Sequence, residues 1–267
     1  MGICTGRTVI ITGAGGGLGA AHAREFARAG ANVVVNDINQ AAAQKVVDEI
    51  TAAGGKAVVN TSDITNYADS ENAVKQAIAE FGDLHVVLNN AGINRDRMFA
   101  SLTEADWDAI MAVHLKGHFC ISSHAVHYWR DQSKAGKKVD ARIINTTSGA
   151  GLQGSIGQSN YAAAKAGICA LTLNQAAELG RYGITANAIA PAARTGMTTA
   201  VESMATRMAK PTDGSFDYWA PENVSSLLVR LMSQAKCLKP RAAKSRSQMA
   251  GVQPNPPTKA QNGSQKS

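Results

Sequence analysis

The sequence predicts an α/β protein with one parallel, doubly wound sheet that is flanked by helices. Strand-like runs alternate with helical stretches along the chain, and this pattern is typical of a parallel sheet because each crossover carries the chain back to the same end. The predicted strands are residues 7–12, 33–35, 57–60, 86–88, 142–145 and 184–189. A chain of 267 residues is long enough for one large domain of this kind, so no second folded domain is required.

A glycine-rich turn connects the first predicted strand to the first predicted helix. Residues 7–12 form a β-branched run, Gly13-Ala14-Gly15-Gly16-Gly17-Leu18-Gly19 follows, and the apolar spacing becomes helical over residues 18–29. A dinucleotide-binding site requires this order, because glycines let the backbone approach a pyrophosphate whose charge the helix N-terminus attracts. The turn also fits Gly-x-Gly-x-x-Ala through Gly15, Gly17 and Ala20, so its register stays open. The alternative interpretation is a tight turn without a ligand.

Asp37 follows the second predicted strand, at the distance from the glycine turn where an acidic side chain accepts hydrogen bonds from the adenosine ribose. The same carboxylate would repel a 2′-phosphate, by up to ~4 kcal/mol for unit charges ~4 Å apart at an effective dielectric of about 20. Neither the turn nor Ile38-Asn39 supplies a compensating Lys or Arg. The sequence therefore predicts NAD rather than NADP as the cofactor. A helix-capping role of Asp37 is compatible with this prediction.

Tyr161 and Lys165 are four residues apart, and Ser148 precedes Tyr161 by 13 residues. On a helix this spacing places the phenol and the ammonium on the same face. An unperturbed Tyr has a pKa of roughly 10, and a nearby positive charge favours the phenolate, so we expect Lys165 to lower the pKa of Tyr161. Such a phenol serves as a general acid and base near neutral pH. By itself the spacing is a weak signal, since an Ala-rich helix carries it by chance with a solvated Lys.

Taken together, these motifs resemble those of the short-chain dehydrogenase/reductase family, over about residues 5–233. The matching positions are Thr12-Gly13, Gly17 and Gly19 in the turn, Asn89-Asn90-Ala91-Gly92 after the fourth strand, and Ser148, Tyr161 and Lys165. Within the family, the chain is most similar to the (3R)-hydroxyacyl-CoA dehydrogenase and 3-oxoacyl reductase-like branch, in segments 33–37, 90–97, 113–117 and 189–191. The resemblance implies a single-domain Rossmann-type fold.

The resemblance also implies roles for individual residues. Tyr161 would protonate or deprotonate the substrate oxygen, Ser148 would orient that oxygen, and Lys165 would lower the pKa of Tyr161 and bind the nicotinamide ribose. Asp63 resembles the aspartate that meets the adenine edge. Residues 90–92 would line the cofactor floor and also brace the sheet as a turn. The cofactor-binding residues implied in this way are Gly13, Gly15, Gly17, Leu18, Gly19, Asp37, Asp63, Ile64, Asn90, Ala91, Gly92, Tyr161, Lys165 and Pro191.

His114 stands where most family members carry an Asn that helps to hold a water in a proton relay. The hydroxyacyl-CoA branch resembles this chain at that position, so His114 is the fourth expected catalytic residue. His114 and His118 also have the i, i+4 spacing of a metal-binding pair, but the sequence offers no nearby third ligand. We therefore expect no metal, and ordinary helix packing is the alternative role of these two side chains.

The charge distribution argues against a nucleic-acid partner. The formal net charge is +7, but 8 of the 27 Lys and Arg residues follow Glu222 and none of the 20 Asp and Glu residues does. The rest of the chain has no basic stripe interleaved with aromatic residues. No apolar run reaches the roughly 18 residues of a membrane span, the first residues lack a signal pattern, and the cysteines form no Cys-x-x-Cys pair. We expect a cytoplasmic protein with reduced thiols.

The C-terminal segment departs from the family pattern. Members usually follow the last helix, here residues 221–233, with a seventh strand and a Gly-Gly turn, whereas this chain continues into a basic segment rich in Pro, Ser and Gln. Such a composition is typical of disorder. We therefore assign residues 1–235 to the dehydrogenase domain and residues 236–267 to a disordered tail. A frameshift, an alternative splice or a gene-model error would produce this break, and a seventh strand in another reading frame of the coding DNA would reveal it.

The function expected from these features is that of an NAD-dependent oxidoreductase that interconverts a secondary alcohol and a ketone, with a 3-hydroxyacyl thioester as substrate. One alternative is a hydroxysteroid or another secondary alcohol as substrate. The other is a cofactor-binding protein that does not turn over because of its altered C-terminus. The family resemblance implies a homodimer or homotetramer formed through two long helices, at about residues 103–131 and 160–180.

Overall fold

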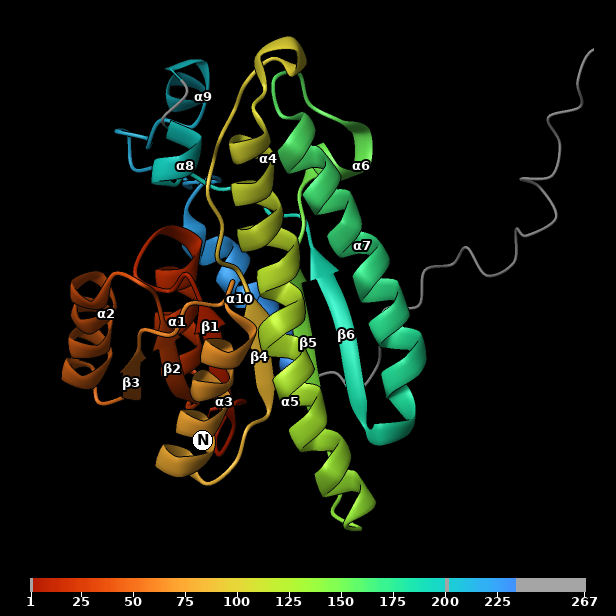
Figure 1. The fold of residues 1–267 in the computed structure, drawn as a ribbon. Coiled ribbons are helices and arrows are strands. Elements are labelled where there is room, and N and C mark those ends of the chain that lie inside the picture. The colour runs from red at the N-terminus through yellow and green to blue at the C-terminus, as the bar shows by residue number, and fades with distance from the viewer. Residues whose placement is uncertain (1, 200–201, 234–267) are drawn as a thin grey trace, which may run out of the picture. The chain divides into compact units, whose positions relative to one another are not determined.

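The computed structural model describes residues 2–199 and 202–233 (Figure 1). These residues form a six-stranded sheet in the order β3-β2-β1-β4-β5-β6, in which every neighbouring pair is parallel. The predicted doubly wound α/β fold is therefore confirmed, and the strand ends differ from the predicted ones by no more than one residue. The strands are β1 (Thr8–Thr12), β2 (Asn32–Asn36), β3 (Lys56–Asn60), β4 (Val86–Asn89), β5 (Ala141–Thr146) and β6 (Ile184–Ile189).

The strand order reverses between β1 and β4. The chain adds β2 and β3 on one side of β1, and then β4, β5 and β6 on the other. Both β1 and β4 are buried along their whole length, which is why their sequences are mostly apolar rather than alternating. At such a switch point the connections leave toward opposite faces of the sheet, and a crevice opens at the carboxyl ends of the strands. The fold therefore places a ligand site beyond the ends of β1 and β4.

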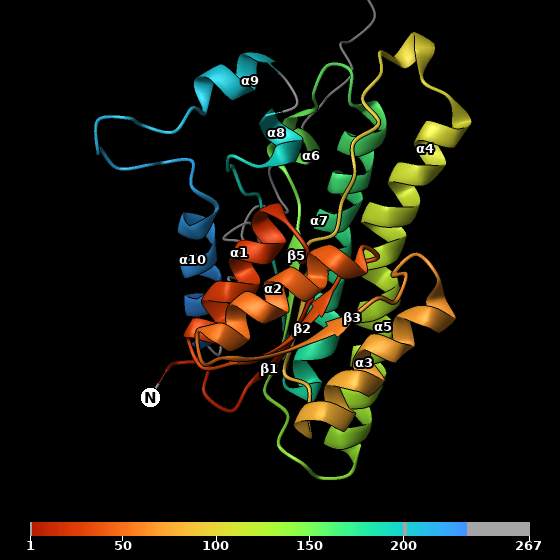
Figure 2. The same cartoon turned by 90° about the vertical axis from the view of Figure 1, so that its left-hand side faces the viewer.

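Helices cover both faces of the sheet (Figure 2). Phe26 and Leu228 are fully buried on one face, and Ile121 and Trp129 are buried on the other. Full burial of one such apolar side chain contributes roughly 1.5–3 kcal/mol, so both layers hold the sheet firmly. The first face carries α1 (Gly17–Arg28), α2 (Gln40–Ala52) and α10 (Pro221–Ser233), and the second carries α3 (Tyr67–Phe81), α5 (Gly117–Lys134) and α7 (Ser159–Leu179).

The single long helix predicted over residues 103–131 is divided into three parts. Helix α4 (Glu104–Ile110) leads into a π-helical turn, Met111–Lys116, and α5 follows directly. A π turn widens the helical hydrogen-bond pattern by one residue, a local change that the spacing of apolar residues does not reveal. His114 lies in this turn. The long helix predicted at about residues 103–131 is confirmed in extent, since residues 104–134 are helical throughout, and the π turn is a local feature that the prediction did not include.

Short helices complete the fold at the carboxyl end of the sheet. They are α6 (Gly149–Gln153), α8 (Gly196–Thr199) and α9 (Glu202–Arg207), together with a 3₁₀ turn at Phe99–Ser101. A second 3₁₀ turn, Gly180–Tyr182, connects α7 to the start of β6 at the opposite end of the sheet. Within the described residues β6 is the last strand and lies at an edge of the sheet. The predicted disordered tail and the place of a seventh strand lie outside the described residues. Among the described residues no helix has both the length and the apolar character to cross a membrane.

Candidate active site

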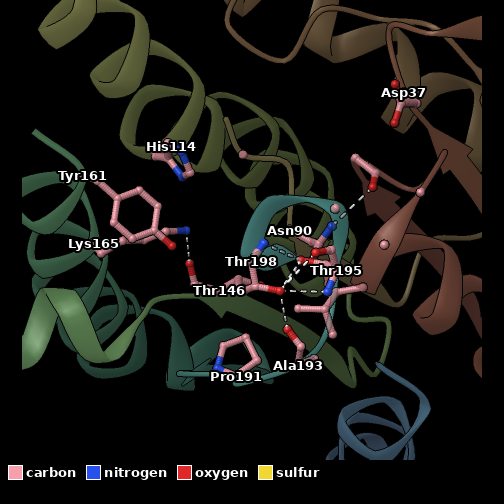
Figure 3. Close-up of a pocket in the computed structure, with 16 residues that line it drawn as sticks. Asp37, Asn90, His114, Thr146, Tyr161, Lys165, Pro191, Ala193, Thr195 and Thr198 are labelled. Carbon is pink, nitrogen blue, oxygen red and sulfur yellow. Dashed lines mark hydrogen bonds between the residues drawn. The ribbon is translucent and has the colours of Figure 1, made fainter. Parts of the chain in front are cut away.

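A cavity of about 380 Å³ lies where the strand order reverses, beyond the carboxyl ends of the strands (Figure 3). It is formed by the turn after β1, the segment after β4, the π turn, the end of β5, α7 and the segment after β6. Figure 3 shows Tyr161 and Lys165 on one side of this cavity and Asp37 on the opposite side. The lining residues are Gly13, Gly16, Gly17, Leu18, Asp37, Asn90, Gly92, His114, Thr146, Tyr161, Lys165, Pro191, Ala193, Thr195, Gly196 and Thr198.

The glycine turn brings bare backbone to the cavity. Gly13 and Gly17 have φ angles of 63° and 52°, in the left-handed region that other residues rarely adopt. A Cβ on Gly19 would lie 2.1 Å from the Gly13 carbonyl oxygen, so this residue must also lack a side chain. These three positions settle the register that the sequence left open, in favour of Thr-Gly-x-x-x-Gly-x-Gly. Because no side chain caps the N-terminus of α1, its first N–H groups are available to an anion such as a pyrophosphate.

Asp37 is fixed at the end of β2 by two backbone N–H groups. Its Oδ2 accepts a hydrogen bond of 3.0 Å from Gly15, and its Oδ1 accepts one of 2.9 Å from Asn39. A Cβ on Gly15 would lie 2.8 Å from Oδ2, so the close approach of the turn to the carboxylate requires a glycine. The carboxylate thus has a fixed orientation at the rim of the cavity, as recognition of a ribose diol requires.

The segment after β4 is held against the glycine turn. The hydroxyl oxygen of Thr12 accepts hydrogen bonds from the N–H groups of Asn90 (2.9 Å) and Ala91 (3.0 Å). The Asn90 side chain donates to the Thr12 carbonyl at 3.0 Å. A Cβ on Gly13 would lie 2.7 Å from the Cα of Ala91, so the two segments pack backbone to backbone. This brace fixes one wall of the cavity, to which Asn90 and Gly92 contribute directly.

Six of the residues expected at the site do not line this cavity. Gly15, Gly19 and Ala91 lie in the turns just described, and Ser148 is in contact with Tyr161. Asp63 instead accepts hydrogen bonds of 2.8 Å from the backbone and hydroxyl of Thr65. Ile64 is buried, with its Cδ1 atom 2.7 Å from where a Cβ on Gly117 would lie. The structure thus places Asp63 and Ile64 beside the site rather than in its wall.

Tyr161, Lys165 and Ser148 converge on the other side of the cavity. Lys165 is 2% exposed, its ammonium donates a 2.7 Å hydrogen bond to the Thr146 carbonyl, and its Nζ lies 5.5 Å from the centre of the Tyr161 ring. The Ser148 side chain is hydrogen-bonded to that of Tyr161. Helix α7 brings Tyr161 and Lys165 to one face, as the four-residue spacing predicts, and the turn after β5 supplies Ser148. The three groups form a compact acid–base cluster.

The pKa of Tyr161 differs from the sequence-based expectation. Burial of the phenol raises this pKa, the hydrogen bond from Ser148 opposes the rise, and the carboxylate of Asp96 adds to it. Burial also lowers the pKa of Lys165 to about 7, so near neutral pH its amine carries only part of a positive charge. The expected lowering of the Tyr161 pKa by Lys165 is therefore wrong for this arrangement, because burial is the largest influence on the phenol and raises its pKa.

His114 is buried against Tyr161 and is bonded to the backbone after β4. Its ring meets the Tyr161 ring edge-on at 5.1 Å, and its Nε2 lies 2.8 Å from the carbonyl oxygen and 3.1 Å from the backbone nitrogen of Ile93. Burial, and then the charge of Lys165, lower its pKa to about 3, so the ring is neutral. His118 is fully buried nearby. In the part of the chain that the structure describes, no three His, Cys, Asp or Glu side chains are grouped as metal ligands.

Thr146, Thr195 and Thr198 line the cavity but were not among the expected catalytic or cofactor-binding residues. Thr146 supplies a carbonyl to Lys165, while Thr195 and Thr198 form a hydrogen-bonded turn after β6. The Thr198 hydroxyl accepts from the Thr195 N–H at 2.8 Å and donates to the Ala193 carbonyl at 3.0 Å. Thr146 is the last residue of β5, and Thr195 and Thr198 follow β6. These positions were the available signal, because the crevice lies at the carboxyl ends of the strands.

Comparisons with known proteins agree with this geometry. The family model for short chain dehydrogenases matches residues 7–206. The hydroxyacyl-CoA dehydrogenase ChsB1 of Mycobacterium tuberculosis is 50% identical over 179 residues, which are 64% of this chain and 56% of that protein. The peroxisomal multifunctional enzyme type 2 of Mus musculus is 44% identical over 182 residues, which are 65% of this chain and 24% of that protein. The chain therefore spans about half or less of the length of these two relatives.

A solved structure provides a further comparison. The crystal structure of a short chain dehydrogenase from Mycobacterium avium is 55% identical, with a TM-score of 0.78 over 88% of this chain and 80% of that one. The matched region contains the glycine turn, the Ser148, Tyr161 and Lys165 cluster and all six strands. The chain belongs to the short chain dehydrogenase family.

Proposed function

We propose that this protein is an NAD-dependent oxidoreductase that interconverts a secondary alcohol and a ketone, and that its substrate is a 3-hydroxyacyl thioester. One observation carries the proposal: a half-buried Tyr161, with Ser148 and Lys165 beside it, borders the same cavity as the glycine turn and Asp37. An acid–base group and a dinucleotide cradle in one cavity are the two parts that such a reaction requires.

The residues around the cavity fit a dinucleotide. The backbone of the turn at Gly13, Gly17 and Leu18 would hold the pyrophosphate at the N-terminus of α1. The Asp37 carboxylate would accept hydrogen bonds from the adenosine ribose, and its charge favours NAD over NADP. Lys165 would reach the second ribose, and Pro191 lies in the wall beside it.

The protein groups manage the proton of the reaction. When bound, the nicotinamide cofactor accepts or delivers the hydride. The Tyr161 hydroxyl transfers a proton to or from the substrate oxygen, and Ser148 orients that oxygen by a hydrogen bond. Because burial raises the pKa of Tyr161, the phenol is protonated at neutral pH and is ready to donate to a ketone. The neutral His114 ring is hydrogen-bonded to the backbone of Ile93 and packs edge-on against the ring of Tyr161, which holds that ring in place.

The choice of an acyl thioester rests on the relatives and on the surface beside the site. Two relatives described above carry hydroxyacyl-CoA dehydrogenase or peroxisomal multifunctional enzyme in their names. Large apolar side chains are exposed on the segments after β4 and β5 that flank Tyr161, with Phe99 76% and Ile156 90% exposed. An acyl chain would bury such surface at roughly 25 cal/mol per Å².

The proposed function is tested by mixing the purified protein with NAD and 3-hydroxyhexanoyl-CoA. We expect NADH absorbance to grow, and Tyr161→Phe to abolish the growth while NAD binding is retained. Turnover of a hydroxysteroid or of 2-butanol without turnover of the thioester would replace the proposed substrate. A wild type that binds NAD and turns over none of the three would instead support the alternative of a cofactor-binding protein without activity.

We also propose that the protein forms a homodimer or homotetramer through its long helices. Met111, Leu115 and Phe119 of the π turn and α5, together with Leu171 of α7, line an apolar hollow on the surface. Phe119 is 49% exposed, and contact with a second copy of the chain would remove this aromatic surface from water. Analytical ultracentrifugation tests this proposal, and a monomer for the wild type would contradict it. The replacement Phe119→Lys is expected to shift the protein toward the monomer.

A further inference from the structure

Tyr161 lies in a helix end that does not hold itself in place. It is the third residue of α7, and Gln158 at the N-cap makes no side-chain capping bond. The first N–H groups of a helix have no backbone partner within it, and helix ends fray unless side chains or contacts outside the helix satisfy them. The position of the phenol therefore depends on contacts outside α7.

Three consecutive residues of the segment after β4 supply such contacts. The N–H of Arg97 donates to the Gly157 carbonyl at 2.8 Å, and the Asp96 carboxylate accepts a 2.9 Å hydrogen bond from the Gln158 side chain. The Arg95 carbonyl accepts from the Asn160 side chain at 3.2 Å. The segment and the start of α7 lie side by side in Figures 1 and 2. We call residues 95–97 the tether.

Asn160 is the most constrained part of this contact. Its side chain is fully buried, and its Oδ1 accepts a 2.8 Å hydrogen bond from the Tyr161 N–H. Its Nδ2 donates to the carbonyls of Arg95 and, at 3.3 Å, Asp106. One amide therefore links the backbone of Tyr161 to the segment after β4, at Arg95, and to α4, at Asp106.

The tether also lies close enough to the phenol to act on its charge. After burial and the Ser148 hydrogen bond, the Asp96 carboxylate is the third influence on the pKa of Tyr161, and it raises that pKa. Gln158 holds this carboxylate by its hydrogen bond. The tether therefore contacts the start of α7 through its backbone and also holds the charged carboxylate of Asp96 near Tyr161.

From this geometry we propose that Asn160 and Gln158 are positioning residues for proton transfer at Tyr161, because they tie the first turn of α7 to the tether. The inference rests on the proposed function. The same segment continues into Met98 and Phe99, which are 60% and 76% exposed. An apolar part of the substrate that contacts these two side chains therefore also contacts the segment that sets the place of the phenol.

The test compares Asn160→Ala with the wild type in NAD-dependent oxidation of 3-hydroxyhexanoyl-CoA. We expect kcat to fall about tenfold or more, since a displacement of ~1 Å can cost about 10²-fold. The Kd for NAD and the KM for the thioester are expected to change less than about threefold, because neither ligand is bound by Asn160. The deuterium isotope effect on kcat, with the thioester deuterated at C3, is expected to rise because the chemical step becomes slower.

A matched control lies on the same helix. Thr172 is buried and hydrogen-bonded to Asn145, far along α7 from Tyr161, so Thr172→Val also removes a buried hydrogen bond. We expect that variant to lose thermal stability but to keep kcat and the isotope effect. If Asn160→Ala does not fold, Gln158→Ala is used as the test variant, because it removes only the hydrogen bond to Asp96. We expect Gln158→Ala to lower kcat about threefold and to increase the isotope effect.

The possible outcomes separate this inference from the proposed function. A wild type with no turnover overturns the proposed function and this inference with it. If the wild type turns over and the folded Asn160→Ala variant has the same kcat and isotope effect, this inference alone is overturned. Where Gln158→Ala is the test variant, an unchanged kcat and isotope effect in that variant overturn the inference in the same way. A fall in kcat in Thr172→Val as large as that in Asn160→Ala would show a general effect of α7 stability and would also overturn it.

Discussion

The ammonium nitrogen of Lys165 lies 5.5 Å from the centre of the Tyr161 ring, on the same face of α7. Its hydrogen bond to the Thr146 carbonyl, at 2.7 Å, anchors it at the end of β5. Burial lowers the pKa of this amine to about 7 and raises the pKa of the phenol, so the two groups carry little net charge at neutral pH. The pair is therefore sensitive to small changes of pH and of local charge.

The titration of Lys165 gives the first prediction. NAD carries negative phosphates, so we expect its binding to weaken as the pH rises through about 7, where Lys165 loses its proton. In Lys165→Met this step should be absent, and kcat should fall by about 10²-fold or more, because the ribose that Lys165 is proposed to hold would lose its position beside Tyr161. Isothermal titration of NAD between pH 6 and pH 8 measures the step. An unchanged step in the variant would assign it to another group.

Asp37 gives a prediction about cofactor choice. The variant Asp37→Asn removes the charge but retains an oxygen that can accept the N–H of Gly15. We expect the preference for NAD over NADP to fall by tenfold or more, because repulsion of a 2′-phosphate can reach ~4 kcal/mol at ~4 Å and a dielectric of about 20. Binding of both cofactors measures the change. Asp37→Ala serves as the comparison, since it loses the hydrogen bond as well, and equal preference in wild type and Asp37→Asn would contradict the role.

The contact between Gly92 and His114 gives a prediction about stability. A Cβ at position 92 would lie 2.5 Å from the Cε1 atom of His114, too close for either to remain in place. Gly92→Ala is therefore expected to lower the free energy of unfolding by about 1–3 kcal/mol, the usual cost of overpacking. In a His114→Ala background the same change should cost much less, because the ring is gone. Urea denaturation of the four proteins measures this coupling, and additive costs would contradict the contact.

The sequence predicts the fold and part of the site because those features are local. The strand of residues 8–12, the glycines after it and the four-residue spacing of Tyr161 and Lys165 each lie within a few residues, where periodicity and turn chemistry act. The reversal of strand order after β3 then follows from the general rules for parallel sheets. These features required no knowledge of distant contacts.

What the sequence does not reveal depends on contacts between distant residues. The tether contacts residues far away in the sequence, since Asp96 and Gln158, which share a hydrogen bond, are 62 positions apart. The Thr146 carbonyl that receives Lys165 is a backbone group, and backbone groups leave no mark in the side-chain pattern. The pKa of Tyr161 was predicted in the wrong direction because burial is a property of the packed protein, whereas the sequence shows only that a cation is near. The π turn at His114 was likewise not predicted from the sequence.

The last prediction concerns acid and a histidine remote from the cavity. His22 is fully buried between α1 and α10, with its Nδ1 atom 2.7 Å from the Ser225 hydroxyl and no hydrogen-bond partner at Nε2 among the described residues. Burial lowers its pKa from 6.5 to about 4. Between these two pH values the unfolded chain binds a proton that the folded protein excludes. Stability supplied by the neutral ring is therefore complete above pH 6.5 and is lost as the pH falls toward 4.

Each pKa unit corresponds to about 1.4 kcal/mol, so the full loss from His22 is about 3 kcal/mol. In the double variant His22→Leu/Ser225→Ala, which removes the ring and its hydroxyl partner together, the fall in unfolding free energy between pH 6.5 and pH 4 should be smaller by about this amount. The exposed His127, changed to Gln, is the control for loss of a histidine at the surface. Urea denaturation at a series of pH values measures the slopes. If the double variant loses stability with acid as steeply as the wild type, proton exclusion by His22 is not what weakens the fold.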